Sequence, residues 1–359
     1  MNKIAELISR LCPDGVEFKT LDSLVSYVQP GPYIVSSTEY DTHYSTPVLT
    51  AGQSFILGYT NEEEGIYNAS SQKPVIIFDD FTTSFHWVDF DFKVKSSALK
   101  ILKIKDKQEA DFRYIYMAMK TIHFIPTNHM RHWISLYSKF EIPLPPLNIQ
   151  KEIVSILDSF TSLIDKMKQE VEMRKKQMEY YLNILICKDN VAARLFGDIG
   201  VVQRGKRVVR KELALQGCIP VFQNSLTPLG YYQYSNIPAN NTFVISAGTA
   251  GEIGFSAKPF WAADDCLVIS SVLCDSKYLY YYLKTQEQFL KSQIRGGAMK
   301  RLSRETIEKL EIPVPSLEKQ RQIVSILDTF ETYISKLEKM IELRQKQYEY
   351  YREKLLTFE

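Results

Sequence analysis

Residues 141–185 read EIPLPPLNIQKEIVSILDSFTSLIDKMKQEVEMRKKQMEYYLNIL, and residues 311–355 read EIPVPSLEKQRQIVSILDTFETYISKLEKMIELRQKQYEYYREKL. The two segments align without a gap at an offset of 170 residues, and 23 of their 45 positions are identical. A shared helical composition would give only a handful of identities. The chain therefore contains one unit twice.

Each copy predicts a long helix that follows a proline-rich elbow. Proline is tolerated in the first turn of a helix, where its missing N–H group has no helical partner to lose. Apolar residues then recur at alternating spacings of three and four, with one extra spacing of four, which is a heptad seam with a stutter. The seam positions are Ile153, Ile156, Phe160, Ile164, Met167 and Val171 in the first copy and Ile323, Ile326, Phe330, Ile334, Leu337 and Ile341 in the second.

The two helices are predicted to pair with each other as an antiparallel coiled coil. If the globular part between them is compact, the end of the first helix lies close to the start of the second, and the helices run in opposite directions. A pseudo-two-fold axis would then relate the two halves of the chain. The alternative is that each amphipathic helix packs separately on its own domain.

The remaining sequence predicts two globular heads of the α+β class. The chain is divided into a first head over residues 1–140, a central helix over 141–186, a second head over 187–310 and a C-terminal helix over 311–359. Strand-like runs occupy residues 74–78, 99–104, 242–246 and 266–271, and Tyr-rich helical stretches occupy 112–120 and 276–289. We expect each head to be a mixed α/β domain with a curved sheet.

The overall composition is that of an ordinary globular protein, with 45% hydrophobic and 24% charged residues. No apolar stretch approaches the roughly 18 residues of a membrane span, and the N-terminus lacks the apolar core of a secretory signal. Five cysteines without a Cys-x-x-Cys pair argue against a disulfide framework or a zinc ribbon. We therefore expect a cytoplasmic protein with no membrane partner.

Charge is unevenly distributed along the chain, although the total is only 44 Lys and Arg against 42 Asp and Glu. Residues 187–310 hold 16 basic and 10 acidic side chains, whereas residues 1–140 hold 14 and 16. Each helical segment has one more acidic than basic residue. A basic domain is typical of proteins that bind a polyanion. The second head is therefore the more obvious candidate for a domain that binds a polyanion.

Candidate DNA contacts are polar and basic residues that the sequence places at turns. Arg and Lys suit phosphates and guanine edges, and Gln and Asn suit adenine edges. The alternative for any one cluster is a solvated surface loop. The candidates in the second head are Gln203, Arg204, Lys206, Arg207, Gln223, Asn224, Ser225, Thr249, Arg295, Lys300 and Arg301, and those in the first head are Gln29, Thr82, Thr83, Ser84, His86, His129, Arg131 and His132.

Sequence signatures of catalysis and nucleotide binding are weak. The chain has no Walker A sequence and no Asn/Asp-Pro-Pro-aromatic motif of a DNA methyltransferase. The spacing of Gly248, Gly251 and Gly254 does not fit a dinucleotide loop, and favours a tight turn that lets the backbone approach a ligand. His129-x-x-His132 has no nearby Cys or acidic partner, so a metal site is not predicted there.

One trace of a nuclease exists. Asp80 follows a strand-like run, and Asp91 and Lys93 form a D-x-K pair about ten residues later. Such groups can hold Mg²⁺ for phosphodiester cleavage. The second copy has no equivalent, which would be unusual for an enzyme site in a duplicated chain. A Mg²⁺-dependent nuclease is therefore kept as a minor alternative.

The chain resembles the specificity subunits of type I restriction–modification systems over almost its whole length. The resemblance rests on the repeated Ile-Pro-x-Pro-x-Leu-x-x-Gln-x-x-Ile-Val-Ser-Ile-Leu-Asp segments at 142–158 and 312–328. The opening Cys-Pro-Asp-Gly-Val-Glu at 12–17 and the Phe-Gly-Asp-Ile-Gly...Arg-Gly-Lys-Arg segment at 196–207 also fit.

The resemblance implies two target recognition domains, each reading one half of a bipartite, gapped site in double-stranded DNA. The helices would set the gap and dock two methylation subunits, which bind S-adenosylmethionine and methylate adenine. Restriction subunits that use ATP and Mg²⁺ would complete the assembly. The chain itself would bind no cofactor or metal and would catalyse no reaction. The second alternative is a duplicated coiled-coil scaffold that binds protein or RNA.

Overall fold

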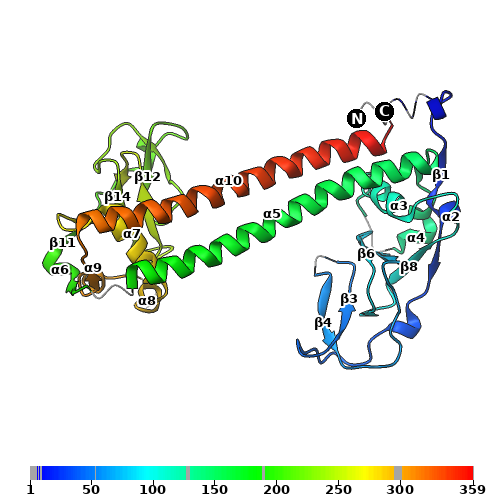
Figure 1. The fold of residues 1–359 in the computed structure, drawn as a ribbon, viewed down its shortest axis with the longest axis horizontal. Helices are drawn as coiled ribbons and strands as arrows, with labels where there is room; N and C mark the ends of the chain where they lie inside the picture. The colour runs from blue at the N-terminus through cyan, green and yellow to red at the C-terminus, as the bar shows by residue number, and fades with distance from the viewer. Residues whose placement is uncertain are drawn as a thin grey trace. The chain divides into compact units, whose positions relative to one another are not determined.

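The computed structural model describes residues 6, 8, 10–52, 54–126, 130–187, 191–294 and 301–358. The chain divides into two compact units. The first comprises Met1–Lys166 and Ile341–Glu359, and the second comprises Met167–Met340. Each unit therefore holds one head and parts of both long helices (Figure 1). The heads are smaller than the units, because the helices run from one unit into the other.

The first head contains two sheets, one antiparallel and one mixed, where the sequence predicted a single curved sheet. The four-stranded sheet has the order β2-β8-β5-β6, and the three-stranded sheet has the order β4-β3-β7. All neighbours are antiparallel except β3 and β7. The strands are β2 (Val25–Val28), β3 (Thr46–Leu49), β4 (Ile56–Thr60), β5 (Val75–Asp79), β6 (Phe85–Val88), β7 (Lys93–Val94) and β8 (Leu99–Ile104).

The four-stranded sheet of the first head is buried on both faces. Side chains alternate along a strand, so β5 sends Ile76 and Phe78 to one face and Val75 and Ile77 to the other. The first face packs on α3 (Phe112–Met119) and the long helices, and the second face packs on the three-stranded sheet. This burial explains why 74–78 reads as a continuous apolar run.

The second head repeats this topology. Its sheets have the orders β11-β17-β14-β15 and β13-β12-β16, and β12 and β16 are again the parallel pair. The strands are β11 (Gly200–Arg204), β12 (Ile219–Phe222), β13 (Gly230–Tyr232), β14 (Asn241–Ile245), β15 (Ile253–Ser256), β16 (Trp261–Ala262) and β17 (Cys266–Ser271). The predicted Tyr-rich helix is interrupted at Gln286 and forms α7 (Ser276–Thr285) and α8 (Glu287–Ser292).

Short elements complete each head. In the first unit these are α2 (Leu21–Leu24), α4 (His132–Ser135) and the antiparallel pair β1 (Phe18–Thr20) and β9 (Glu141–Pro143). In the second unit they are α6 (Phe196–Ile199), α9 (Arg304–Glu308) and the antiparallel pair β10 (Ala193–Leu195) and β18 (Glu311–Pro313). Each pair joins the beginning of a head to the strand before its long helix, which closes the head.

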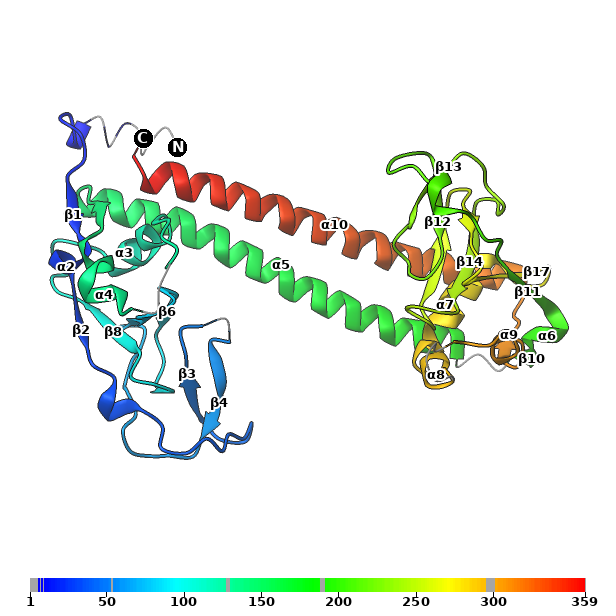
Figure 2. The ribbon, with the colours of Figure 1, turned by 180° about the vertical axis from the view of Figure 1, so that it is seen from behind.

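The long helices are α5 (Leu147–Cys187) and α10 (Leu317–Leu356), and they pair in an antiparallel manner inside each unit. In the first unit the Phe160 ring lies 5.5 Å from Tyr351, and in the second the Tyr181 ring lies 5.5 Å from Phe330. Early residues of one helix thus meet late residues of the other. This confirms the predicted pairing (Figure 2).

Several residues of the predicted seam are buried in the long helices. Ile153, Ile164 and Met167 are buried in α5, and Ile323 and Ile334 are buried in α10. Ile326 is an exception at 43% exposed, whereas its neighbour Leu327 is fully buried. The first turns of each helix pack on a head as well as on the other helix, so the buried stripe there is wider than a heptad seam. Leu157 is fully buried for the same reason.

The joint between each head and its helix explains the repeated sequence motif. Gln150, which is fully buried, accepts a hydrogen bond from the Asp111 backbone N–H (2.8 Å) and donates to Pro145 O (2.7 Å). Gln320 makes the equivalent bonds with Asp275 N–H (2.7 Å) and Pro315 O (2.9 Å). These glutamines tie the start of α3 or α7 to the elbow of the long helix.

A second pair of contacts fixes each head on its helix. Tyr114 Oη donates to Pro143 O (2.9 Å), and Tyr278 Oη donates to Pro313 O (3.0 Å). Burial of Tyr114 raises the pKa of its phenol, which stays a donor. The Asp-x-x-Tyr motif and the Gln of the elbow thus belong to one joint. Within the part of the chain that the structure describes, no helix has the length and apolarity of a membrane span.

Candidate nucleic-acid interface

Three predicted segments of the second head meet on one loop, which links β16 to β17. Arg204, at the end of β11, donates from Nε to Asp264 O (2.6 Å). Gln223, after β12, donates from Nε2 to Asp264 Oδ1 (3.4 Å). Arg301 forms an ion pair with Asp265 Oδ1 through Nη2 (3.2 Å). Segments about 100 residues apart therefore form one polar edge of the second head.

A fourth predicted segment joins the same edge. Thr249, in the turn between β14 and β15, donates its backbone N–H to Asn224 O (2.9 Å). Gly248 has a φ of +85°, and a Cβ there would lie 2.4 Å from Asn224 O. The turn needs glycine for its left-handed conformation and for this close approach. The group that lies close to the Gly248 backbone is thus Asn224 O of the same chain, and not the ligand that the sequence suggested.

The most basic part of this edge is the turn after β11. Gln203, Arg204, Lys206 and Arg207 are exposed, and among the described residues no carboxylate forms an ion pair with Lys206 or Arg207. The Lys206 N–H donates to Ala262 O (2.8 Å), and Trp261 Nε1 donates to Lys206 O (2.7 Å). The backbone is therefore held in place while the cationic side chains remain available to phosphates or base edges.

In the first head the equivalent edge is organised by the buried Asp80. Its carbonyl accepts from His132 N–H (2.8 Å), and its Oδ1 accepts from Trp133 N–H (2.8 Å). Its Oδ2 lies 3.3 Å from the Nζ of Lys100, and both side chains are 1% exposed. Lys100 also donates to Gln29 Oε1 (3.2 Å). Gln29, the β5–β6 turn and the segment at 131–133 thus lie together.

The β5–β6 turn of the first head is built by its own polar residues. Asp79 Oδ1 accepts from the backbone N–H groups of Phe81 (2.8 Å) and Thr82 (2.9 Å). Thr83 adopts a φ of +58°, which is uncommon for a β-branched residue. His86 Nε2 donates to Gly52 O (3.2 Å). Of these residues, Phe81 and Thr82 are exposed.

Two predicted contacts of the first head lie in its interior. Thr83 is 8% exposed and His132 is 4% exposed, and the His132 ring packs edge-on against Phe124. Burial leaves these side chains little surface for DNA and gives them a role in holding the edge. Thr82, Ser84, His86, Gln29 and Arg131 keep accessible surface. His129, Arg295 and Lys300 lie outside the described residues.

The two edges share one equivalent backbone hydrogen bond. The His132 N–H donates to Asp80 O (2.8 Å), and the Leu302 N–H donates to Ser246 O (2.8 Å). The preceding residues, Arg131 and Arg301, are both exposed. The repeat therefore places an arginine at the same position of each edge, although the surrounding residues differ.

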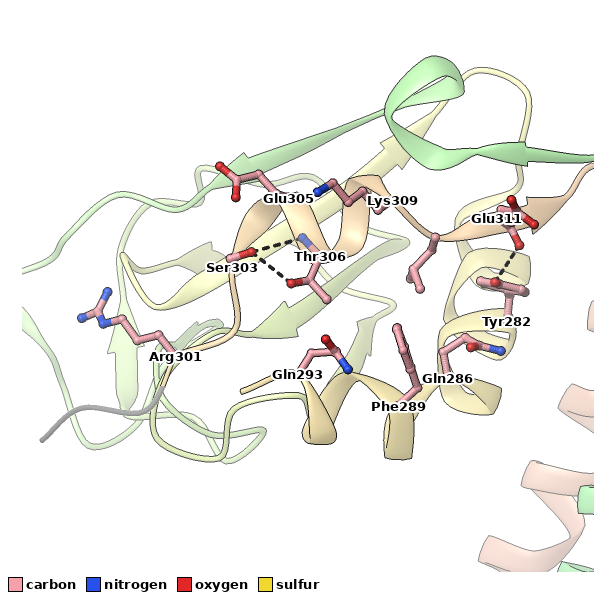
Figure 3. Close-up of a pocket in the computed structure, with 11 residues that line it drawn as sticks. Tyr282, Gln286, Phe289, Gln293, Arg301, Ser303, Glu305, Thr306, Lys309 and Glu311 are labelled. Atoms are coloured by element: carbon pink, nitrogen blue, oxygen red, sulfur yellow. Dashed lines mark hydrogen bonds between the residues drawn. The ribbon is translucent and has the colours of Figure 1, made fainter. Parts of the chain in front are cut away.

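A polar pocket of about 670 Å³ lies beside Arg301, between α8 and α9 (Figure 3). Gln286 and Gln293 come from the end of α7 and the end of α8, and Ser303 and Thr306 form the start of α9. Ser303 Oγ caps α9 by accepting the Thr306 N–H (3.1 Å). The two glutamines were missed by sequence reasoning, although they flank the basic segment before Arg301. They extend the set of amides beside the edge.

The contacts of Asp80 and Lys93 do not support a nuclease. Asp80 is paired with Lys100, whereas Lys93 pairs with Glu62 Oε2 (2.9 Å) and donates to Glu64 O (2.6 Å). Burial opposes ionisation of Glu62, but the Ser37 N–H and the Lys93 ammonium together hold the pKa of its carboxyl below the usual value. In the described part of the chain, no group of three or more His, Cys, Asp or Glu residues could hold a metal ion.

A second candidate surface, missed by sequence reasoning, lies on the long helices. Exposed apolar side chains occur at equivalent positions of the repeat, with nearly equal exposure in each pair. The pairs are Leu163 (42%) and Tyr333 (44%), Met173 (57%) and Leu343 (56%), and Tyr180 (62%) and Tyr350 (58%). Leu163, Leu343 and Tyr350 belong to the first unit, and Tyr333, Met173 and Tyr180 to the second. Each unit thus carries an apolar triplet at equivalent positions, although only the tyrosine at Tyr180 and Tyr350 is identical.

Comparisons with known proteins agree with the duplication. The family model described as the type I restriction modification DNA specificity domain matches residues 13–173 and again residues 189–345. The chain is 37% identical to the type I restriction enzyme EcoR124I/EcoR124II specificity subunit of Escherichia coli, over 96% of this chain and 95% of that protein. It is 28% identical to a Haemophilus influenzae protein named as type I restriction enzyme specificity subunit S.HindORF215P, over 96% of each.

A solved structure shares the fold. The S subunit of a type I restriction–modification system from M. genitalium superposes with a TM-score of 0.70 at 17% sequence identity, covering 95% of this chain and 96% of that chain. Each match of the family model spans one head and most of the helix that follows it. The unit recognised by the comparisons is therefore the unit that the chain repeats.

Proposed function

Because this chain belongs to the family of type I restriction–modification specificity subunits, we propose that it selects the DNA sites on which such a complex acts. Each head would read one half of a bipartite, gapped site in double-stranded DNA. The observation that carries this proposal is the pair of edges at Asp80 and Asp265. The same scaffold presents different polar side chains at these edges.

The proposed reading mechanism separates affinity from sequence preference. Contacts to phosphates give affinity and orientation, and contacts to base edges give sequence. Lys206 and Arg207 are suited to phosphates, whereas the amides of Gln203, Gln223 and Asn224 are suited to base edges. The corresponding phosphate and base contacts of the first head are assigned to Gln29, Thr82 and Arg131. A different residue set at each edge makes the two half-sites different.

The helices are proposed to set the gap and to dock two methylation subunits. The nearly equal exposure of the repeated apolar triplets supports two copies of one partner, because equivalent apolar surfaces related by the repeat can bind the same partner. S-adenosylmethionine, ATP and Mg²⁺ would be bound by the methylation and restriction subunits. This chain would then be a non-catalytic, cytoplasmic member of the complex and would bind no cofactor or metal itself.

Exchange of one head tests the proposal. A chain whose residues 190–310 come from another family member is expressed with its methylation subunits, and the methylated bases of genomic DNA are mapped. We expect one half of the bipartite motif to change and the other half to stay. A change in both halves, or methylation that does not depend on this chain at all, would refute the assignment of one half-site to each head.

A further inference from the structure

A pocket of about 460 Å³ lies beside the β5–β6 turn of the first head. Its lining includes two candidate DNA contacts, Ser84 and His86, and Lys120 at the end of α3. Arg352, near the end of α10, also lines it. The pocket therefore combines the first head with a residue from the last turns of the chain. All of these residues belong to the first unit.

The pocket is positively charged, and its charges are not neutralised. None of the described residues that line it is acidic. In the described structure no carboxylate forms an ion pair with Lys120 or Arg352. Both cations lie near tyrosine rings instead. Lys120 Nζ is 4.4 Å from the centre of the Tyr116 ring, and the Arg352 guanidinium is 6.0 Å from the centre of the Tyr348 ring. The first head as a whole has a net charge of −2 over residues 1–140, so this is a local exception.

Arg352 also carries an unsatisfied donor. Its Nε is inaccessible to solvent, and among the described residues no group accepts its hydrogen. A buried N–H without an acceptor is unfavourable, so the guanidinium would gain from reorienting toward an acceptor that enters the pocket. Ser84 adds a hydroxyl: its Oγ accepts a hydrogen bond from Thr82 Oγ1 (3.1 Å), and its own hydrogen stays free for a ligand. The pocket thus presents donors and positive charge.

The second unit does not contain this arrangement. At the position that corresponds to Lys120, Lys284 is neutralised by Glu287 at 2.9 Å. At the position that corresponds to Arg352, the chain has Leu182. The second head has its cations on the turn after β11 instead. The pocket therefore adds positive charge to the first head, whose edge holds few cationic side chains.

We propose that this pocket binds a backbone phosphate of the DNA half-site that the first head reads, with Lys120 and Arg352 as the cationic contacts. The proposal rests on the function proposed above. Arginine and lysine are the usual partners of phosphate, and a guanidinium can bind it with two hydrogen bonds. The C-terminal helix would thus complete the DNA contacts of the N-terminal head.

The test uses the assembled complex of this chain with its methylation subunits. Binding to a duplex that contains the methylated motif is measured over a series of salt concentrations for Lys120→Ala, Arg352→Gln and Lys284→Ala. We expect the first two variants to bind about tenfold more weakly. The slope of log K against log[salt] should be less steep by roughly 0.9 for each lost phosphate contact. Lys284→Ala is the matched control and should behave as the unchanged protein.

The outcomes separate this inference from the proposed function. If the unchanged complex methylates a bipartite motif but both Lys120→Ala and Arg352→Gln keep its affinity and salt slope, the pocket binds no phosphate. If the unchanged complex shows no dependence on the motif, the proposed function fails first. Thermal unfolding of each variant identifies a loss of folding. Lys120 is exposed, so its variant decides the question even if Arg352→Gln is unstable.

Discussion

At the scale of single residues, the repeated motif is explained by hydrogen bonds that its side chains make in the interior. Gln150 and Gln320 are fully buried and bond to backbone groups of both the head and the elbow. If such a buried amide is removed, its backbone partners cannot bond to water instead, because no water reaches them. Among the identical residues of the two copies, these glutamines therefore mark the joint between head and helix.

Gln150→Leu is predicted to destabilise the first unit. The substitution removes the acceptor of the Asp111 N–H and the donor to Pro145 O, and each buried group left without a partner costs about 1–3 kcal/mol. We expect a clear decrease in the midpoint of thermal unfolding. Gln108→Leu, at an exposed site of the same head, is the control. Equal stability of the two variants would contradict the role of the joint.

Lys206→Ala is predicted to weaken DNA binding without affecting folding. The Lys206 side chain is exposed, and its backbone alone holds the turn. Loss of one phosphate contact lowers the salt dependence of binding by roughly one unit of slope. The measurement is a salt titration of the assembled complex, with Lys346→Ala on α10 as the control. An unchanged slope would remove the turn after β11 from the contact set.

At the scale of elements, the helices follow directly from their sequence, whereas the sheets do not. The runs at 99–104 and 266–271 are strands β8 and β17 with the expected bounds. Their partners are distant in sequence, since β8 lies between β2 and β5. The two-residue strands β7 and β16 are too short for any periodic signal. The division of each head into two sheets therefore depends on pairings that no local pattern encodes.

The exposed apolar triplets make a prediction about partner number. Leu343→Ser combined with Tyr350→Ser changes the triplet of the first unit alone. Both side chains are more than half exposed, so the fold should lose little stability. We expect native mass spectrometry of the complex to find one methylation subunit instead of two.

The control for this experiment is Met340→Ser. Met340 is 47% exposed, but its counterpart in the repeat is Glu170, so it lies outside the repeated triplets. This variant should keep both copies of the partner. If the double variant also keeps both copies, the triplets do not dock the methylation subunits, and the partner binds elsewhere on the chain.

At the scale of the whole molecule, the first compact unit draws on both ends of the chain, whereas the second does not. The hydrophobic core of the first unit contains Leu355 and Leu356 together with Leu21 and Tyr114. The second unit is formed by the continuous segment Met167–Met340. The last turns of α10 are therefore a structural part of the first head's unit, although the whole second unit separates them from that head in sequence.

Truncation after Met340 is predicted to destabilise the first unit selectively. It removes Leu355 and Leu356, each worth about 1.5–3 kcal/mol when buried. Amide hydrogen exchange should become faster in α3 of the first head and stay unchanged in α7 of the second. Equal acceleration in both helices would show that the two units do not unfold separately.

The amino-acid sequence by itself determined the duplication, the two long helices, their antiparallel pairing and the family. These properties depend on local periodicity and on the similarity of one segment to another, which a single sequence contains in full. It also located the turns that carry polar residues. Its charge, counted by segment, separates a basic second head from a first head with excess acid.

Only the tertiary structure decided which of those turns lie together and which side chains are accessible. Thr83 and His132 are similar in character to their exposed neighbours, yet the fold buries them. Arg352 lies more than 200 residues from Lys120 and lines the same pocket. Contact between distant residues depends on the pairing of strands and helices, because burial is a property of the assembled surfaces rather than of any residue.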